Sequence, residues 1–105
     1  MRNALDDLTR PAAPIEATAA SRGGRVAIAL RRFADARVAY VAVYRHAGRG
    51  TFGIGDRGSQ LVCVTTGGKC FDTTRPYPRV ARYAAIARDR WNASAPAYSN
   101  PVSKP

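Results

Sequence analysis

Two β-rich runs on either side of a glycine pair, within residues 37–72, most strongly constrain how this chain can fold. Residues 60–66 read Gln-Leu-Val-Cys-Val-Thr-Thr, and they are followed by Gly67-Gly68 and by a second short run at 69–72. This order is a strong local signal for a β-hairpin. Upstream, residues 37–45 are dense in valine and tyrosine and predict a central strand, apolar on both sides. The stretch therefore predicts a small antiparallel sheet of three to four strands.

The state of the two cysteines depends on the register of this hairpin. A two-residue Gly-Gly loop leaves Cys63 opposite Asp72, whereas a four-residue loop over 65–68 places Cys63 opposite Cys70 and permits a disulfide. Gly-Gly favours the shorter loop, so free thiols are the preferred prediction and the disulfide is the alternative. A zinc site is not indicated, because two cysteines and one histidine fall short of the four ligands that zinc takes.

Helical spacing predicts two helices that pack against this sheet. Residues 78–91 begin with a proline after a possible threonine cap, and their apolar side chains recur at intervals of three and four. Residues 25–36 fit an amphipathic helix, but their first half also fits a strand that turns into the next one. We prefer the helix there. The predicted fold class is α+β, with the sheet at about 37–72, a C-terminal helix at 78–91 and a helix at 25–36.

Composition divides the chain into one compact part and two flanking segments. Residues 1–24 contain two prolines and six alanines but few large apolar side chains, which predicts a flexible arm. Residues 92–105 include three prolines and predict an extended or disordered tail. Residues 25–91 then form a single α+β domain, and a chain of 105 residues leaves no room for a second.

The net charge of +10 belongs to the predicted domain. Residues 25–91 carry thirteen basic side chains against four acidic ones. A compact and strongly positive body attracts nucleic acid or an acidic protein surface. No apolar run reaches membrane-spanning length and no secretory signal begins the sequence, so we expect a cytoplasmic protein without a membrane partner.

Motifs for catalysis are weak, and neither an enzyme nor a cofactor is expected. His46 is the single histidine, so a hydrolase triad or a metal site cannot be assembled from motifs. Residues 53–58 match the spacing G-x-G-x-x-G, but the chain then enters a predicted strand. A dinucleotide site needs a helix to begin at that point, so this match is attributed to a glycine-rich turn.

The preferred function is a small, basic, non-enzymatic protein that binds DNA or RNA, with arginines contacting the phosphates. Tyrosines and phenylalanines on the predicted strands would offer stacking surfaces for bases. The residues expected to bind nucleic acid or another partner lie at strand ends, in loops and on the C-terminal helix: Arg37, Arg45, Arg49, Arg57, Lys69, Arg79, Arg82, Ile86 and Arg90.

Two alternatives accompany this prediction. The first is a small regulator or inhibitor, of the phage- or plasmid-type accessory kind, that docks on an acidic face of a larger protein machine. In that case Ile86 would be an apolar anchor within a charged rim. The second is a toxin-like ribonuclease that uses Tyr44, Arg45, His46 and Arg49.

Overall fold

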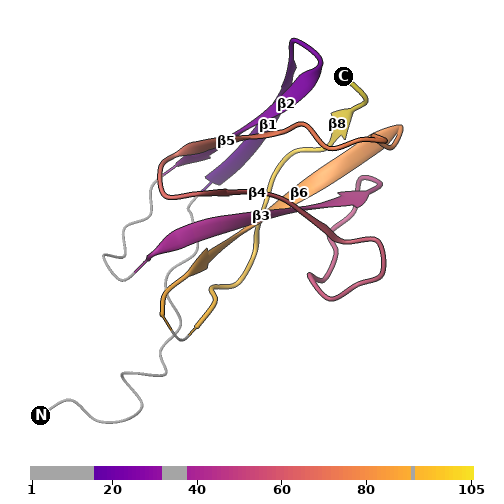
Figure 1. The fold of residues 1–105 in the computed structure, drawn as a ribbon. Coiled ribbons are helices and arrows are strands. Elements are labelled where there is room, and N and C mark those ends of the chain that lie inside the picture. The colour runs from indigo at the N-terminus through magenta and orange to yellow at the C-terminus, as the bar shows by residue number, and fades with distance from the viewer. Residues whose placement is uncertain (1–15, 32–37, 91) are drawn as a thin grey trace, which may run out of the picture.

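The computed structural model describes residues 16–31, 38–90 and 92–105, and the regular secondary structure in these ranges consists of β-strands alone (Figure 1). The strands are β1 (Glu16–Arg22), β2 (Arg25–Arg31), β3 (Tyr40–Ala47), β4 (Gln60–Thr65), β5 (Lys69–Asp72), β6 (Val80–Arg88), β7 (Ala97–Tyr98) and β8 (Val102–Ser103). The α+β prediction is therefore wrong, and the fold is all-β.

The strands form two antiparallel sheets that pack as a sandwich (Figure 1). The smaller sheet has the order β1-β2-β5, and the larger sheet has the order β4-β3-β6-β7, with β8 also paired to β6. Side chains from both sheets fill one core, because alternate residues of each strand point inward. Val26 and Ile28 of the smaller sheet meet Val41 and Val43 of the larger sheet there, and all four are fully buried.

Strand β6 replaces the helix predicted at 78–91. It pairs with β3 over eight residues, from Tyr40↔Arg88 to Ala47↔Ala81. Its alanines have high intrinsic helix propensity, but pairing with β3 on one side and β7 and β8 on the other overrides that preference. Both faces of β6 are largely buried, so the two-residue alternation that identifies a strand is masked in its sequence.

A Gly-Gly hairpin does exist, but it joins β1 to β2. Gly23 and Gly24 have φ values of 58° and 82°, and Arg22 pairs with Arg25 across the turn. Two positive φ angles suit the right-handed twist of the flanking strands. The helix predicted at 25–36 is thus a strand over 25–31, with its remainder outside the described residues. The arm predicted at 1–24 is likewise strand and turn from residue 16 onward.

The segment that contains Gly67 and Gly68 crosses from one sheet to the other. Strand β4 pairs with β3 in the larger sheet, whereas β5 pairs with β2 in the smaller one, so the predicted hairpin between them is wrong in both registers. The backbone N–H of Leu30 donates to the Gly68 carbonyl at 2.8 Å, which fixes the crossing against β2. Residues 51–54 lie in the loop before β4 and add no strand.

Cys63 and Cys70 form a disulfide that joins the two sheets beside this crossing, with their Cα atoms 6.2 Å apart. The preference for free thiols is therefore wrong. Cys63 lies opposite Val43 and Cys70 opposite Ile28, and both of those neighbours face the core. The disulfide closes one side of the sandwich from within. It forms even though the hairpin over 65–68, which was expected to be its condition, does not.

Residues 92–105, predicted as a tail, complete the larger sheet. β7 and β8 both pair with β6, and Ser94 and Ser99 are buried, so this segment is an integral part of the sandwich. The Asn100 side chain accepts a hydrogen bond from the Ala19 N–H and donates one to the Ala19 carbonyl, both at 2.9 Å. Asn100 thus imitates a strand residue at the edge of β1.

Candidate functional site

A buried ion pair between Arg45 of β3 and Asp72 of β5 links the two sheets. Nη1 of Arg45 lies 2.8 Å from Oδ2 of Asp72, and the two side chains are 6% and 0% exposed. The same guanidinium donates to Oγ1 of Thr74, to Oε1 of Gln60 and to the Pro76 carbonyl. Both terminal nitrogens of this head group are thus directed at protein oxygens. Arg45 therefore has a structural role.

Two tyrosines extend this network into the core. The Tyr83 hydroxyl donates to Oδ2 of Asp72 at 2.6 Å, and it lies 2.9 Å from the Tyr77 hydroxyl. Burial by itself raises the pKa of Asp72, but hydrogen bonds from Thr74, Tyr83 and Arg45 outweigh it and leave that pKa below its usual value. Burial raises the pKa of Tyr77 and of Tyr83, so both hydroxyls stay protonated.

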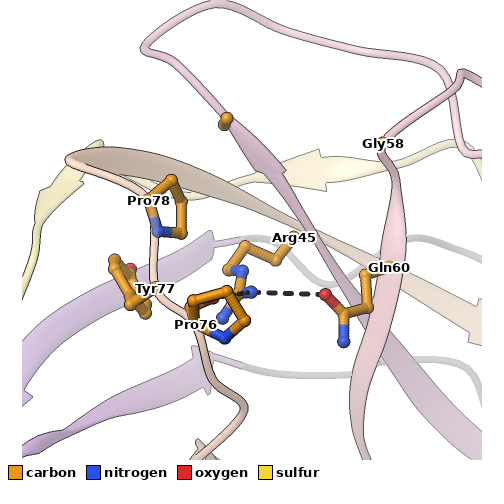
Figure 2. A pocket seen from close by; sticks show the side chains of 7 residues that line it. Arg45, Gly58, Gln60, Pro76, Tyr77 and Pro78 are labelled. Carbon is orange, nitrogen blue, oxygen red and sulfur yellow. Dashed lines mark hydrogen bonds between the residues drawn. The ribbon is translucent and has the colours of Figure 1, made fainter.

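A pocket of about 270 Å³ opens beside Arg45 (Figure 2). The Arg45–Gln60 hydrogen bond runs across it, and Pro76, Tyr77 and Pro78 form one wall. The Arg45 guanidinium also stacks over the Tyr77 ring, 4.8 Å from the ring centre. Because its nearest charge is neutralised by Asp72, the pocket offers little attraction to an anionic ligand.

The outer face of the larger sheet, directed away from the core, is divided into a covered half and an open half. In the covered half, Phe52 from the loop before β4 stacks on His46 with ring centres 5.1 Å apart and meets the edge of Tyr98 at 5.6 Å. Arg82 lies over the Tyr98 ring, 5.5 Å from its centre, and donates to the carbonyls of Ser99 and Arg49. This half is closed by the chain itself.

The open half carries the exposed large hydrophobic side chains of the described residues. Tyr40, Leu61 and Val64, which we call the apolar patch, are 37%, 50% and 52% exposed. Val64 pairs with Ala42 and Leu61 with Tyr44, while Tyr40 lies two residues before Ala42 on the same strand. A bulge at Val62 of β4 shifts the register by one residue and so brings Leu61 opposite Tyr44.

Ile86 forms the floor of this half. It pairs with Ala42 in the centre of the sheet and is only 5% exposed. The prediction that Ile86 is an exposed anchor is therefore wrong, although Ile86 does lie on this face of the sheet. Leu61 and Val64 are the protruding residues, and they were not predicted because the expected hairpin paired β4 with β5 instead of β3. Their exposure depends on β4 being an outer strand.

The predicted basic residues do not form one cationic surface. Lys69 lies on the outer face of the smaller sheet, opposite Ala29, whereas Arg82 lies on the outer face of the larger one. Arg45 is inside the sandwich. The others, apart from Arg37 outside the described residues, are exposed at loops or strand ends: Arg49, Arg57, Arg79 and Arg90. This distribution contradicts the predicted nucleic-acid interface.

The predicted ribonuclease set is separated by the fold as well. Arg45 and His46 are neighbours on β3 and point to opposite faces, the first toward Asp72 and the second toward Phe52. Within the described ranges, no three His, Cys, Asp or Glu side chains gather as a metal site would require. The same ranges contain no helix long and apolar enough to cross a membrane.

No family model matches this sequence, and no curated protein matches it. Its fold is nevertheless similar to that of solved structures. A titin structure of several domains superposes with a TM-score of 0.68 at 12% identity, covering 90% of this chain and 32% of that one. A structure of titin kinase with its flanking domains gives a TM-score of 0.68 at 16% identity, covering 89% of this chain and 17% of that one.

An Fn3-like protein from Clostridium thermocellum gives a TM-score of 0.63 at 16% identity, covering 87% of this chain and 91% of that one. The chain thus spans about a third or less of the titin chains but nearly all of the bacterial one. These similarities establish the fold as a β-sandwich of the Fn3 and immunoglobulin kind. They correct the α+β assignment, and with it the nucleic-acid function that had been based on an arginine-coated sheet and helix.

Proposed function

We propose that this chain is a non-catalytic binding module that docks on an acidic surface of another protein through the apolar patch. The main support for this proposal is that Tyr40, Leu61 and Val64 are exposed together on adjacent strands of one face. A soluble sandwich gains nothing in folding from apolar side chains left in water on its outer surface, so their clustering favours an interface. This corresponds to the alternative function drawn from the sequence.

The surroundings of the patch support an interface of the usual form, apolar in the centre and charged at the rim. Ala42, Ala84 and Ile86 lie on the same face but are almost fully buried, so the surface that a partner can touch is made by Tyr40, Leu61 and Val64 themselves. Arg88 pairs with Tyr40 and so lies at the margin of the patch. A partner would therefore meet a small apolar surface with a cation beside it.

The charge of the module argues for an acidic partner over a second copy of the same chain. The described residues hold thirteen Lys and Arg side chains against four Asp and Glu. Two such bodies repel each other at long range, whereas an acidic surface is attracted and its association accelerated. The neighbouring folds support a non-catalytic role, since similar sandwiches are domains of the much longer titin chains.

Photocrosslinking tests this proposal at single-residue resolution. Leu61 is replaced by the photoreactive p-benzoylphenylalanine, and Ala29, exposed on the outer face of the smaller sheet, receives the same residue as a control. After irradiation in the native host, we expect a discrete adduct from position 61 that Val64→Glu abolishes. Burying the exposed halves of three apolar side chains stabilises a complex by roughly 2–3 kcal/mol, so Val64→Glu should weaken binding at least tenfold.

The proposal fails if position 61 gives no adduct, or if positions 61 and 29 give the same adducts. It also fails if the adduct survives Val64→Glu. Circular dichroism of each variant checks that the sandwich is intact. We expect it to be, because the side chains at positions 61 and 64 are half exposed and their replacement leaves the core unchanged.

The disulfide supports locating this function in an oxidising compartment, in place of the cytoplasm expected from the sequence. Alkylation of the native protein before and after reduction, followed by mass spectrometry, tests this directly. Two alkylated cysteines before reduction would favour the cytoplasm.

A further inference from the structure

The edges of the two sheets differ in how they are protected against pairing with another chain. An unprotected edge strand exposes a row of N–H and C=O groups, and natural sandwiches block such edges with charges, prolines, short strands or covering side chains. β1 is covered at Ala19 by the Asn100 amide. β5 is only four residues long and carries Lys69 and Asp72. β7 and β8 have two residues each, with Pro101 between them.

Strand β4 lacks nearly all of these devices. Its six residues, Gln60–Thr65, include no charged residue and no proline, and among the described residues β4 pairs only with β3. Its one irregularity is the bulge at Val62, which leaves the run from Cys63 to Thr65 regular. The exposed Leu61 and Val64 also stand on this strand. The least protected edge therefore adjoins the apolar patch.

We infer that the free edge of β4 accepts an extended acidic segment of the partner protein as an added strand. This inference rests on the proposed function and names the mode of binding. Backbone hydrogen bonds to β4 would supply affinity, and alternate side chains of the added strand would cover Leu61 and Val64. The larger sheet would then gain one strand beyond β4.

The acidic character of the segment follows from the positive charge of the chain. Arg57 is exposed three residues before β4, and the described residues carry thirteen basic side chains against four acidic ones. Acidic residues flanking the added strand would be attracted to such a surface. A second copy of β4 would instead bring together two chains that each carry a net charge of +10, and their repulsion opposes that pairing.

The disulfide prepares this edge for binding. Cys63 lies in the middle of β4 and is bonded to Cys70 of the smaller sheet, so the strand is held at its centre from the core side. An edge that is ordered before binding loses less conformational entropy when a partner strand pairs with it. The hydrogen-bonding edge of β4 lies in the plane of the sheet and does not coincide with the disulfide side.

The test uses a fluorescein-labelled peptide, Glu-Glu-Val-Thr-Val-Thr-Val-Glu-Glu, as a model of an acidic strand. A second peptide has the same side chains but N-methyl groups on the valine and threonine amides, which removes their hydrogen-bond donors. Fluorescence anisotropy measures binding to the full chain. Hydrogen–deuterium exchange measures protection of the backbone amides at 60–65.

We expect the unmethylated peptide to bind and to slow exchange at 60–65, and the methylated peptide to bind at least tenfold more weakly. Val64→Glu, which sets a like charge against the acidic peptide at an exposed position, should weaken binding, whereas Ala29→Glu on the outer face of the smaller sheet should not. The inference is overturned if neither peptide binds, if both bind equally, or if the slowed amides lie outside β4. If one of these results is obtained while position 61 still gives its crosslink, the added strand is rejected, but the proposed docking of a partner on the apolar patch is not.

Discussion

Replacing Arg45 by methionine should destabilise the sandwich far more than the same change at an exposed arginine. Methionine preserves the length of the side chain but removes the guanidinium from a site where Arg45 is 5% exposed. Asp72 then keeps its hydrogen bonds from Thr74 and Tyr83 but loses its only cationic partner among the described residues. An uncompensated buried carboxylate is the main cost.

The magnitude follows from the burial of both partners. Removing one member of a buried ion pair costs about 3–5 kcal/mol, whereas breaking an exposed pair costs about 0–1 kcal/mol. A domain of this size has a total stability of roughly 5–15 kcal/mol, so the variant retains a folded state of reduced stability. Since exchanging both charged residues removes the uncompensated charge, Arg45→Met with Asp72→Leu should cost less than the sum of the two single changes.

Urea unfolding monitored by far-ultraviolet circular dichroism measures these differences. With an m-value of roughly 1.5–2 kcal/mol/M, a loss of 4 kcal/mol lowers the midpoint by about 2–3 M. Arg79→Met is the matched control, because Arg79 is exposed, and its midpoint should change by less than about 0.3 M. If Arg45→Met and Arg79→Met have equal midpoints, or if the double variant is additive, the ion pair does not hold the sheets together as described.

Three further predictions concern the core, the disulfide and the effect of pH. Asp72 has a lowered pKa in the folded protein, so its stabilising contribution is complete above the ordinary carboxyl pKa of about 3.9 and is lost as the pH falls below it; Asp72→Asn should flatten the decline of the urea midpoint between about pH 5 and 2. Replacing Cys63 and Cys70 together by serine should cost about 2–3 kcal/mol in urea unfolding, because the bond closes a loop of seven-residue separation, and reductant should then have no additional effect. Ile28→Ala, at a fully buried position, should cost about 2–5 kcal/mol, and a change below 1 kcal/mol would contradict the assignment of this residue to the shared core.

Local patterns in the sequence located strands well where one face is polar or the run is rich in valine. The strands expected at 37–45, 60–66 and 69–72 correspond to β3, β4 and β5. Their pairing was not predictable in the same way, because a glycine pair permits both a hairpin and a crossing between sheets. The chain crosses between the sheets at Gly68 because the Leu30 N–H donates a hydrogen bond to the Gly68 carbonyl. These two residues are far apart in sequence, so no local pattern indicates this contact.

Strands β1 and β6 were not predicted because their inward-facing residues are mostly alanine. β1 has only Ala17 and Ala19 facing the core, so it looked too poor in apolar side chains to be ordered. β6 presents alanines to both faces, which suits a helix and a strand equally. For the functional surface, Arg45 gave no sign that it is buried, because its partner Asp72 is 27 residues away in sequence. Leu61 and Val64 became recognisable only once β4 was known to be an outer strand.

The contact between Asn100 and Ala19 has a consequence for the synthesis of this protein. The two residues are 81 positions apart, so the edge of β1 cannot be closed until residue 100 has been translated. β6 likewise waits for β7 and β8 before its second side is paired. Premature termination near residue 90 would therefore release a chain with two open strand edges, and such a product should be directed to chaperones or proteases instead of folding as a shorter domain.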